Sequence, residues 1–137
     1  SAKPTDTTYV GFVIVVTGPS SFTRELNYYT DSACTSLSLG WYFNNDNATI
    51  GDASGSDYKV TWNQVNQTIF ANTTAGKTFI DDLFGGGMDV TVGTAFVGTT
   101  GVTYYNLIKV SGTSIYLGNP SGTEYPSTTT GAEYVKQ

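Results

Sequence analysis

The chain contains no histidine and a single cysteine, Cys34. Without histidine, Ser-His-Asp and Cys-His catalysis and imidazole metal sites are excluded. A lone cysteine also excludes an intramolecular disulfide and a thiolate zinc site. An enzyme made from this chain would have to use carboxylates, tyrosine or lysine. We therefore expect a non-enzymatic protein with no catalytic residue, no bound metal and no cofactor.

The neighbours of Cys34 indicate that it is unreactive. Asp31 and Ser32 lie close before it, and an acidic neighbour disfavours the thiolate that a reactive cysteine needs. Free cysteines often behave as small buried hydrophobic residues. We expect Cys34 to be buried beside a turn over residues 31–35, which Asp31 would stabilise with local hydrogen bonds.

Charged side chains are also scarce, at 12% of the 137 residues, and the formal net charge is −5. The six basic residues are spread along the chain, so they do not form the basic patch that binds nucleic acid or an anionic membrane surface. No apolar run approaches the roughly 20 residues that span a bilayer, so we expect no membrane insertion. Abundant Thr, Ser, Gly and Asn, together with a polar start, fit a secreted or periplasmic protein.

What the sequence does contain is a series of short segments rich in β-branched and aromatic residues, separated by turn signals. Such segments favour strands, and no long amphipathic helix is present. At 137 residues the chain fits one domain, with a flexible segment at 1–7 and a single domain at 8–137. The expected strands cover residues 8–17, 20–30, 37–43, 56–70, 88–96, 102–110, 113–118 and 133–136.

The segment from Val102 to Gly118 predicts a β-hairpin most clearly. Two arms of β-branched and aromatic residues flank Ser111-Gly112, and glycine tolerates the positive φ of a tight hairpin turn. On the first arm, alternation places Tyr104, Ile108 and Val110 on one face. We expect this hairpin to lie within the main sheet.

The same alternation of side chains along a strand predicts the remaining segments. In residues 20–30, Phe22, Arg24, Leu26 and Tyr28 share one face, and Gly40 suggests a bulge in the next strand. The other expectations are a polar loop at 44–55, one helical turn at 77–84 and an irregular segment at 119–131.

Together these segments predict an all-β fold: a single antiparallel up-and-down β-barrel of about eight strands with at most one short helical turn. Eight antiparallel strands close a sheet whose interior is either filled by side chains or holds one small ligand. The scarcity of charge also leaves edge strands poorly protected, so self-association is a further expectation.

Residues 29–35, which read Tyr-Thr-Asp-Ser-Ala-Cys-Thr, resemble a signature of small secreted bacterial lipocalin-like (calycin-type) β-barrel proteins of unassigned function. Segments 105–112 and 115–118, followed by Tyr134, resemble the C-terminal part of the same proteins. The resemblance implies a lipocalin-like barrel exported across the inner membrane. Those proteins often open on Gly-x-Trp, where this chain has Gly11-Phe12, and they often carry a second cysteine. No functional residue is carried over.

Two polar stretches could carry chemistry. Asp81, Asp82 and Asp89 could hold a hard cation or supply a carboxylate pair for glycoside hydrolysis, although carboxylates in a solvated loop explain them as well. Residues 44–52 have the composition of a calcium loop but lack EF-hand spacing. Three Asn-x-Thr sequons, at Asn47, Asn66 and Asn72, would matter only in a eukaryotic source.

The aromatic residues are the most informative set, with ten Tyr, seven Phe and two Trp. Core packing could absorb most of them, but aromatic walls also suit apolar ligands and sugar faces. The candidate ligand-binding residues are Trp41, Phe43, Tyr58, Trp62 and Tyr104, with Tyr42 beside them.

Three functions follow in order of preference. The first is an exported, non-enzymatic barrel that binds a small apolar or amphipathic ligand. The second is a cell-surface interaction or carbohydrate-binding module, which the abundance of Tyr, Asn and Thr favours. The third is a carboxylate-dependent hydrolase that uses Asp81, Asp82 or Asp89.

Overall fold

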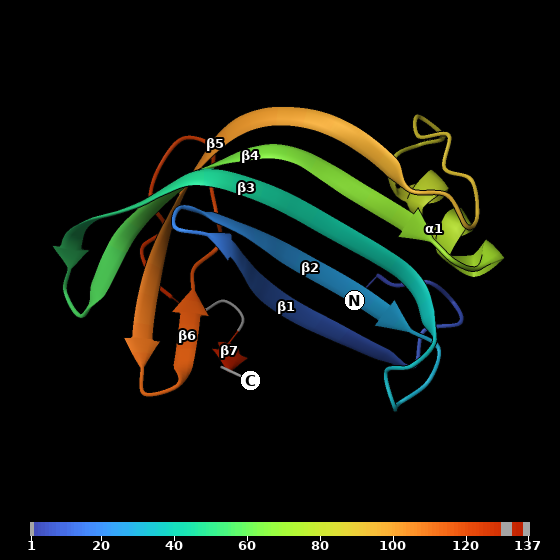
Figure 1. Ribbon diagram of the computed structural model, residues 1–137, viewed down its shortest axis with the longest axis horizontal. Coiled ribbons are helices and arrows are strands. Elements are labelled where there is room, and N and C mark those ends of the chain that lie inside the picture. Colours follow the sequence, from blue (N-terminus) through green and yellow to red (C-terminus); the bar gives the residue numbers. More distant parts are fainter. Residues whose placement is uncertain (1, 130–132, 136–137) are drawn as a thin grey trace.

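A computed structural model describes residues 2–129 and 133–135. The chain forms one antiparallel sheet whose strands follow the order of the sequence, and the sheet curls into a nearly closed barrel (Figure 1). Short α1 covers one end of the barrel. The strands are β1 (Tyr9–Gly18), β2 (Ser21–Tyr29), β3 (Leu37–Ser54), β4 (Asp57–Ala71), β5 (Phe96–Ser111), β6 (Ser114–Leu117) and β7 (Glu133–Val135), with α1 (Thr74–Leu83) between β4 and β5.

The predicted all-β single barrel with one short helix is confirmed. Consecutive strands pair antiparallel throughout, and α1 lies within the longer connection between β4 and β5. The hairpin predicted over 102–118 is formed by β5 and β6. Ser111 pairs with Ser114, which makes Gly112 and Thr113 the two connecting residues, one position later than expected. Gly112 has a φ of 60°, which glycine adopts without strain.

The polar loop predicted at 44–55 is wrong, because β3 continues to Ser54. Cross-strand hydrogen bonds satisfy its polar side chains. The Asn44 amide donates to Asn66 Oδ1 at 2.6 Å, and the Thr49 and Thr61 hydroxyls bond at 2.7 Å. Composition suggested a loop, whereas pairing along the long β4 strand stabilises an extended backbone.

The strand predicted at 88–96 is also wrong, since β5 begins only at Phe96. Residues 88–95 instead form an irregular connection that follows α1. Val90 inserts into the core with 1% of its surface exposed, and the Gly93 N–H donates to the Ala71 carbonyl at 2.8 Å. The described chain therefore has seven named strands rather than about eight.

The helix is longer than the single turn that the sequence predicted. Thr73 begins it, and its hydroxyl accepts a hydrogen bond from the Gly76 N–H at 3.0 Å, as an N-cap does. Ile80 on α1 is fully buried against a cluster that includes Leu39 and Ile69. Across the described residues, no helix has both the length and the hydropathy to cross a membrane.

The expectation that Cys34 is buried is wrong, because its side chain is exposed. The predicted turn is present: Asp31 accepts hydrogen bonds from the Thr35 and Ser36 N–H groups at 3.0 and 3.1 Å. Cys34 has a φ of 57° within this turn, between β2 and β3. The turn thus holds Cys34 outside the sheet and away from any core.

The segment before β1 packs against the barrel, although the sequence suggested a loosely attached end. Pro4 is fully buried and Thr7 is buried. The Ser38 hydroxyl donates to the Asp6 carboxylate at 2.6 Å, and the Lys3 ammonium donates to the Thr7 carbonyl at 3.0 Å. These contacts attach the segment near the α1 end, where Ser38 also lies.

Gly76→Ala tests how closely α1 approaches the sheet. A Cβ at residue 76 would lie 2.4 Å from the Ser38 carbonyl oxygen, so α1 would have to move away from β3. We expect a loss of about 1 to 3 kcal/mol in urea unfolding, even though alanine favours helices. Thr78→Ala, at an exposed position on the same helix, is the control and should leave the midpoint almost unchanged. Equal midpoints for the two variants would contradict this packing.

The hydrogen bonds in the turn at Asp31 predict how the Asp31 carboxyl group titrates. A hydrogen bond from the Thr35 hydroxyl, followed by one from the Ser36 N–H, lowers the pKa of Asp31 below its ordinary 3.8. Because the folded-state pKa is lowered, the turn is stabilised above the unfolded-state pKa, and this contribution is lost as the pH falls through the folded value. In an NMR titration, Thr35→Val should move the pKa of Asp31 upward and Thr35→Ser should restore it. Identical pKa values in all three proteins would refute the assignment.

Candidate functional site

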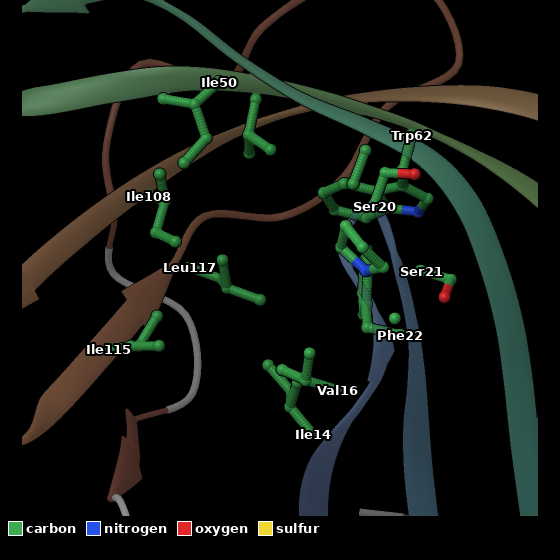
Figure 2. A pocket seen from close by; sticks show the side chains of 14 residues that line it. Ile14, Val16, Ser20, Ser21, Phe22, Ile50, Trp62, Ile108, Ile115 and Leu117 are labelled. Atoms are coloured by element: carbon green, nitrogen blue, oxygen red, sulfur yellow. The ribbon is translucent and has the colours of Figure 1, made fainter.

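A cavity of about 290 Å³, shown in Figure 2, lies at the end of the barrel opposite α1, which is labelled in Figure 1. Its walls come from the β1–β2 hairpin, the second half of β3, the first half of β4, and the β5–β6 hairpin. Most of its side chains are aliphatic. The lining residues are Ile14, Val16, Gly18, Pro19, Ser20, Ser21, Phe22, Ala48, Ile50, Val60, Trp62, Ile108, Ile115 and Leu117.

Strand pairing explains why these side chains converge. Directly paired residues in an antiparallel sheet share a face. Val16 pairs with Phe22 on β2, and Ile108 pairs with Leu117 on β6. Because the sheet is curled, the inner faces of these distant pairs are turned toward one another. Figure 2 shows Ile115 and Leu117 on one side of the space, with Phe22 and Val16 on the other.

Trp62 forms the inner wall of the cavity. Its side chain is 2% exposed, and its ring meets the edge of the Phe22 ring with centroids 5.4 Å apart. Tyr104, its partner on β5, lies beside it at 6.4 Å. Edge-to-face contacts of this kind add to the stabilisation from burial, so the wall is fixed by packing from three strands.

The cavity opens where β1 and β6 face each other without pairing (Figure 2). Large aliphatic side chains at this opening stay accessible: Val16 is 76% exposed and Ile50 is 68% exposed. Apolar side chains gathered around an opening on a protein surface are typical of a ligand or partner site. An apolar group could therefore enter from this side and contact the wall behind it.

A polar layer lies next to the cavity, on the side toward α1. Asn45 pairs with Phe22 on one side and with Gln64 on the other, and both Asn45 and Gln64 are buried. Arg24 pairs with Ile14, which itself lines the cavity. The apolar cavity is thus bordered by amide and guanidinium groups rather than by carboxylates.

The structure brings two of the predicted ligand-binding residues to this site. Trp62 lines the cavity, and Tyr104 contacts Trp62 from the neighbouring strand β5. Trp41 and Phe43 lie nearer α1, where the Trp41 indole N–H donates to Gln67 Oε1 at 2.9 Å. Tyr58 is 50% exposed and does not line the cavity.

The aliphatic residues that make most of the cavity were not predicted as site residues from the sequence. The signal was present, because residues 8–17 form an apolar run and alternation placed Ile108 on one face of its strand. The predicted ligand-binding residues were all aromatic, so the aliphatic residues of these strands were not included. Alternation shows which residues share a face, but it does not show which faces the curled sheet brings together.

The acidic candidates are not assembled into a site. Asp81 accepts a hydrogen bond from the Lys77 ammonium at 2.7 Å within α1, whereas Asp82 and Asp89 are exposed. Among the residues that the structure describes, no three His, Cys, Asp or Glu side chains are grouped so that they could hold a metal ion. Asp81 and Asp82 lie on α1, and Asp89 lies in the irregular connection that follows it. Their places in the helix and the loop account for these carboxylates without a binding site.

A second, polar hollow of about 450 Å³ lies along residues 119–128. Tyr125 is the aromatic ring that lines it, and this ring is already in contact with other groups. It packs edge-on against Tyr105 at 5.2 Å and lies 5.0 Å from the Lys59 ammonium. The ring is thus engaged on the barrel wall, and the hollow lacks a free aromatic platform for a sugar.

Comparison with protein-family models and with curated proteins finds no match to this chain.

Phe22→Ala tests whether the aromatic wall supports the barrel. Removal of the ring enlarges the cavity and exposes Trp62, so we expect a loss of about 2 kcal/mol in urea unfolding and a red shift of tryptophan emission. Phe12→Ala removes the same ring from an exposed position on β1 and should cost only about 0.5 kcal/mol. An equal loss in both variants would show that the wall contributes nothing specific.

Proposed function

We propose that this protein is a non-enzymatic, exported β-barrel that binds a small apolar or amphipathic ligand. The observation that supports this proposal is the cavity of about 290 Å³ bounded by aliphatic side chains and Trp62. Its size is close to the lower end of the usual range for ligand sites, roughly 300 to 1,000 Å³. An apolar wall with few polar groups favours a lipid-like molecule over a sugar.

The contrast between the two ends of the barrel supports the same proposal. At the α1 end, Leu39, Ile69 and Ile80 are fully buried, so side chains fill the interior. At the other end, Val16 and Ile50 remain accessible to solvent. Exposed aliphatic groups are unfavourable in water, and a bound apolar ligand would remove that cost.

The other two functions have less support. A carbohydrate-binding module needs an accessible aromatic face among polar groups, and Tyr125 in the polar hollow is packed against Tyr105 and Lys59. A carboxylate-dependent glycoside hydrolase needs paired carboxylates, and Asp81 is joined to Lys77. Trp62, in contrast, faces a space that is free of protein atoms.

Binding of the neutral fluorescent probe N-phenyl-1-naphthylamine tests the proposal. We expect saturable enhancement of its fluorescence by the native protein. Ile50→Trp places a larger side chain at the rim of the cavity and should weaken binding at least about tenfold, since the ring occupies part of the space that the probe needs.

Val97→Trp adds the same ring at an exposed position outside the cavity and should bind the probe like the native protein. Absence of saturable binding, or equal weakening by both variants, would count against a ligand in this cavity. Mass spectrometry of small molecules that co-purify with the native protein would then identify its natural occupant.

A further inference from the structure

Three paired segments, one each from β1, β2 and β3, form part of the barrel wall. Together they place a single charged side chain, that of Arg24, on the inner face. In the paired residues 10–16, 22–28 and 39–45, every inward-facing side chain except that of Arg24 is uncharged. Arg24 pairs with Ile14 on one side and Phe43 on the other. An arginine surrounded by apolar neighbours is costly unless its guanidinium finds a partner.

Among the residues that the structure describes, Arg24 has no such partner. In residues 2–129 and 133–135, the sole ion pair is that between Lys77 and Asp81. The Nε of Arg24 is buried and has no hydrogen-bond acceptor. The Nε–H is therefore an unused donor on the inner face of the barrel, and Arg24 pairs with Ile14, which lines the cavity.

Asn45 presents an unused acceptor in the same layer. Its side chain is 4% exposed, and its Nδ2 donates to the carbonyls of Phe22 and Phe43 at 3.3 and 2.9 Å. Because both of these partners are acceptors, the amide cannot be turned around. Its Oδ1 is then directed away from them, and it is buried without a hydrogen bond.

Arg24 and Asn45 flank the same cavity residue. Phe22 is two positions before Arg24 on β2 and directly opposite Asn45 on β3, so all three side chains lie on the inner face. Residues diagonal across a strand pair are about 7 to 8 Å apart, a distance that one small headgroup can bridge. The two unused groups therefore border the inner end of the apolar cavity together.

We propose that the ligand is an amphipathic anion whose apolar tail fills the cavity and whose headgroup lies between Arg24 and Asn45. This inference rests on the proposed function and adds the chemistry of the headgroup. A carboxylate accepts hydrogen bonds from the Arg24 guanidinium, and a hydroxyl or N–H beside the carboxylate donates to Asn45 Oδ1. The chemical class is thus a hydroxylated fatty acid or an N-acyl amino acid with a chain of medium length.

Displacement of bound N-phenyl-1-naphthylamine tests this headgroup site. The competitors are 3-hydroxydecanoate, decanoate and the neutral 1-decanol. We expect Arg24→Met to weaken 3-hydroxydecanoate about tenfold, as the loss of a charge-assisted hydrogen bond does, and to leave 1-decanol within about twofold. The native protein should also bind 3-hydroxydecanoate more tightly than decanoate, because only the former can donate to Asn45.

Lys109→Met is the matched control. It removes the same charge from an exposed residue next to Ile108 in sequence, on the other face of β5. It should leave both competitors unchanged, which separates a local contact from the general charge of the protein. Circular dichroism and retained probe binding check that Arg24→Met is folded.

The outcomes separate this inference from the proposed function. Equal displacement by 3-hydroxydecanoate from the native protein and from Arg24→Met would overturn the headgroup site while leaving an apolar ligand in place. Equal weakening by Lys109→Met would overturn it as well. Failure of the native protein to bind the neutral probe would instead remove the proposed function itself.

Discussion

The long pairing between β3 and β4 is the constraint on which the rest of the barrel depends. These two strands are the central members of the sheet, and their register shifts after Asn44, after Asp46 and after Ile50. A bulge bends a strand and increases its twist. Repeated irregularities along one pair therefore curl the sheet, so that β1 and β6 come to face each other. Without this curl the cavity would be an open sheet surface.

The curl also divides the interior into zones of different chemistry. At one end α1 and the connection through Val90 close the barrel, and the core is filled. At the other end none of the described residues forms a covering helix, and aliphatic side chains from β1, β6 and the strands between them line the cavity. Between the two zones lie the Arg24 Nε and the Asn45 Oδ1, which are buried without a hydrogen-bond partner in the part of the chain that the structure describes. The position of the cavity is thus a consequence of where the covering helix lies.

The strands on either side of the opening, β1 and β6, are each paired with other strands. β1 pairs with β2 along its length, while β6 pairs with β5 and with the short β7. β1 carries no charged residue, and several of its apolar side chains are exposed. An uncharged edge strand of this kind is poorly protected against association with other chains. The same strand therefore shapes the entrance to the cavity and, within the described residues, pairs along one edge only.

The sequence by itself determined the all-β class, the hairpin over 102–118, the turn at Asp31 and the common face of Phe22, Arg24, Leu26 and Tyr28, because these depend on local propensity and on alternation along one strand. It could not show that residues 44–54 are extended, since the hydrogen bonds that satisfy Asn44 come from another strand. Tertiary structure alone decided that Trp62 lines the cavity while Trp41 lies nearer the filled core. Both residues sit on inward-facing strand positions, and only the curl of the sheet and the place of α1 separate them.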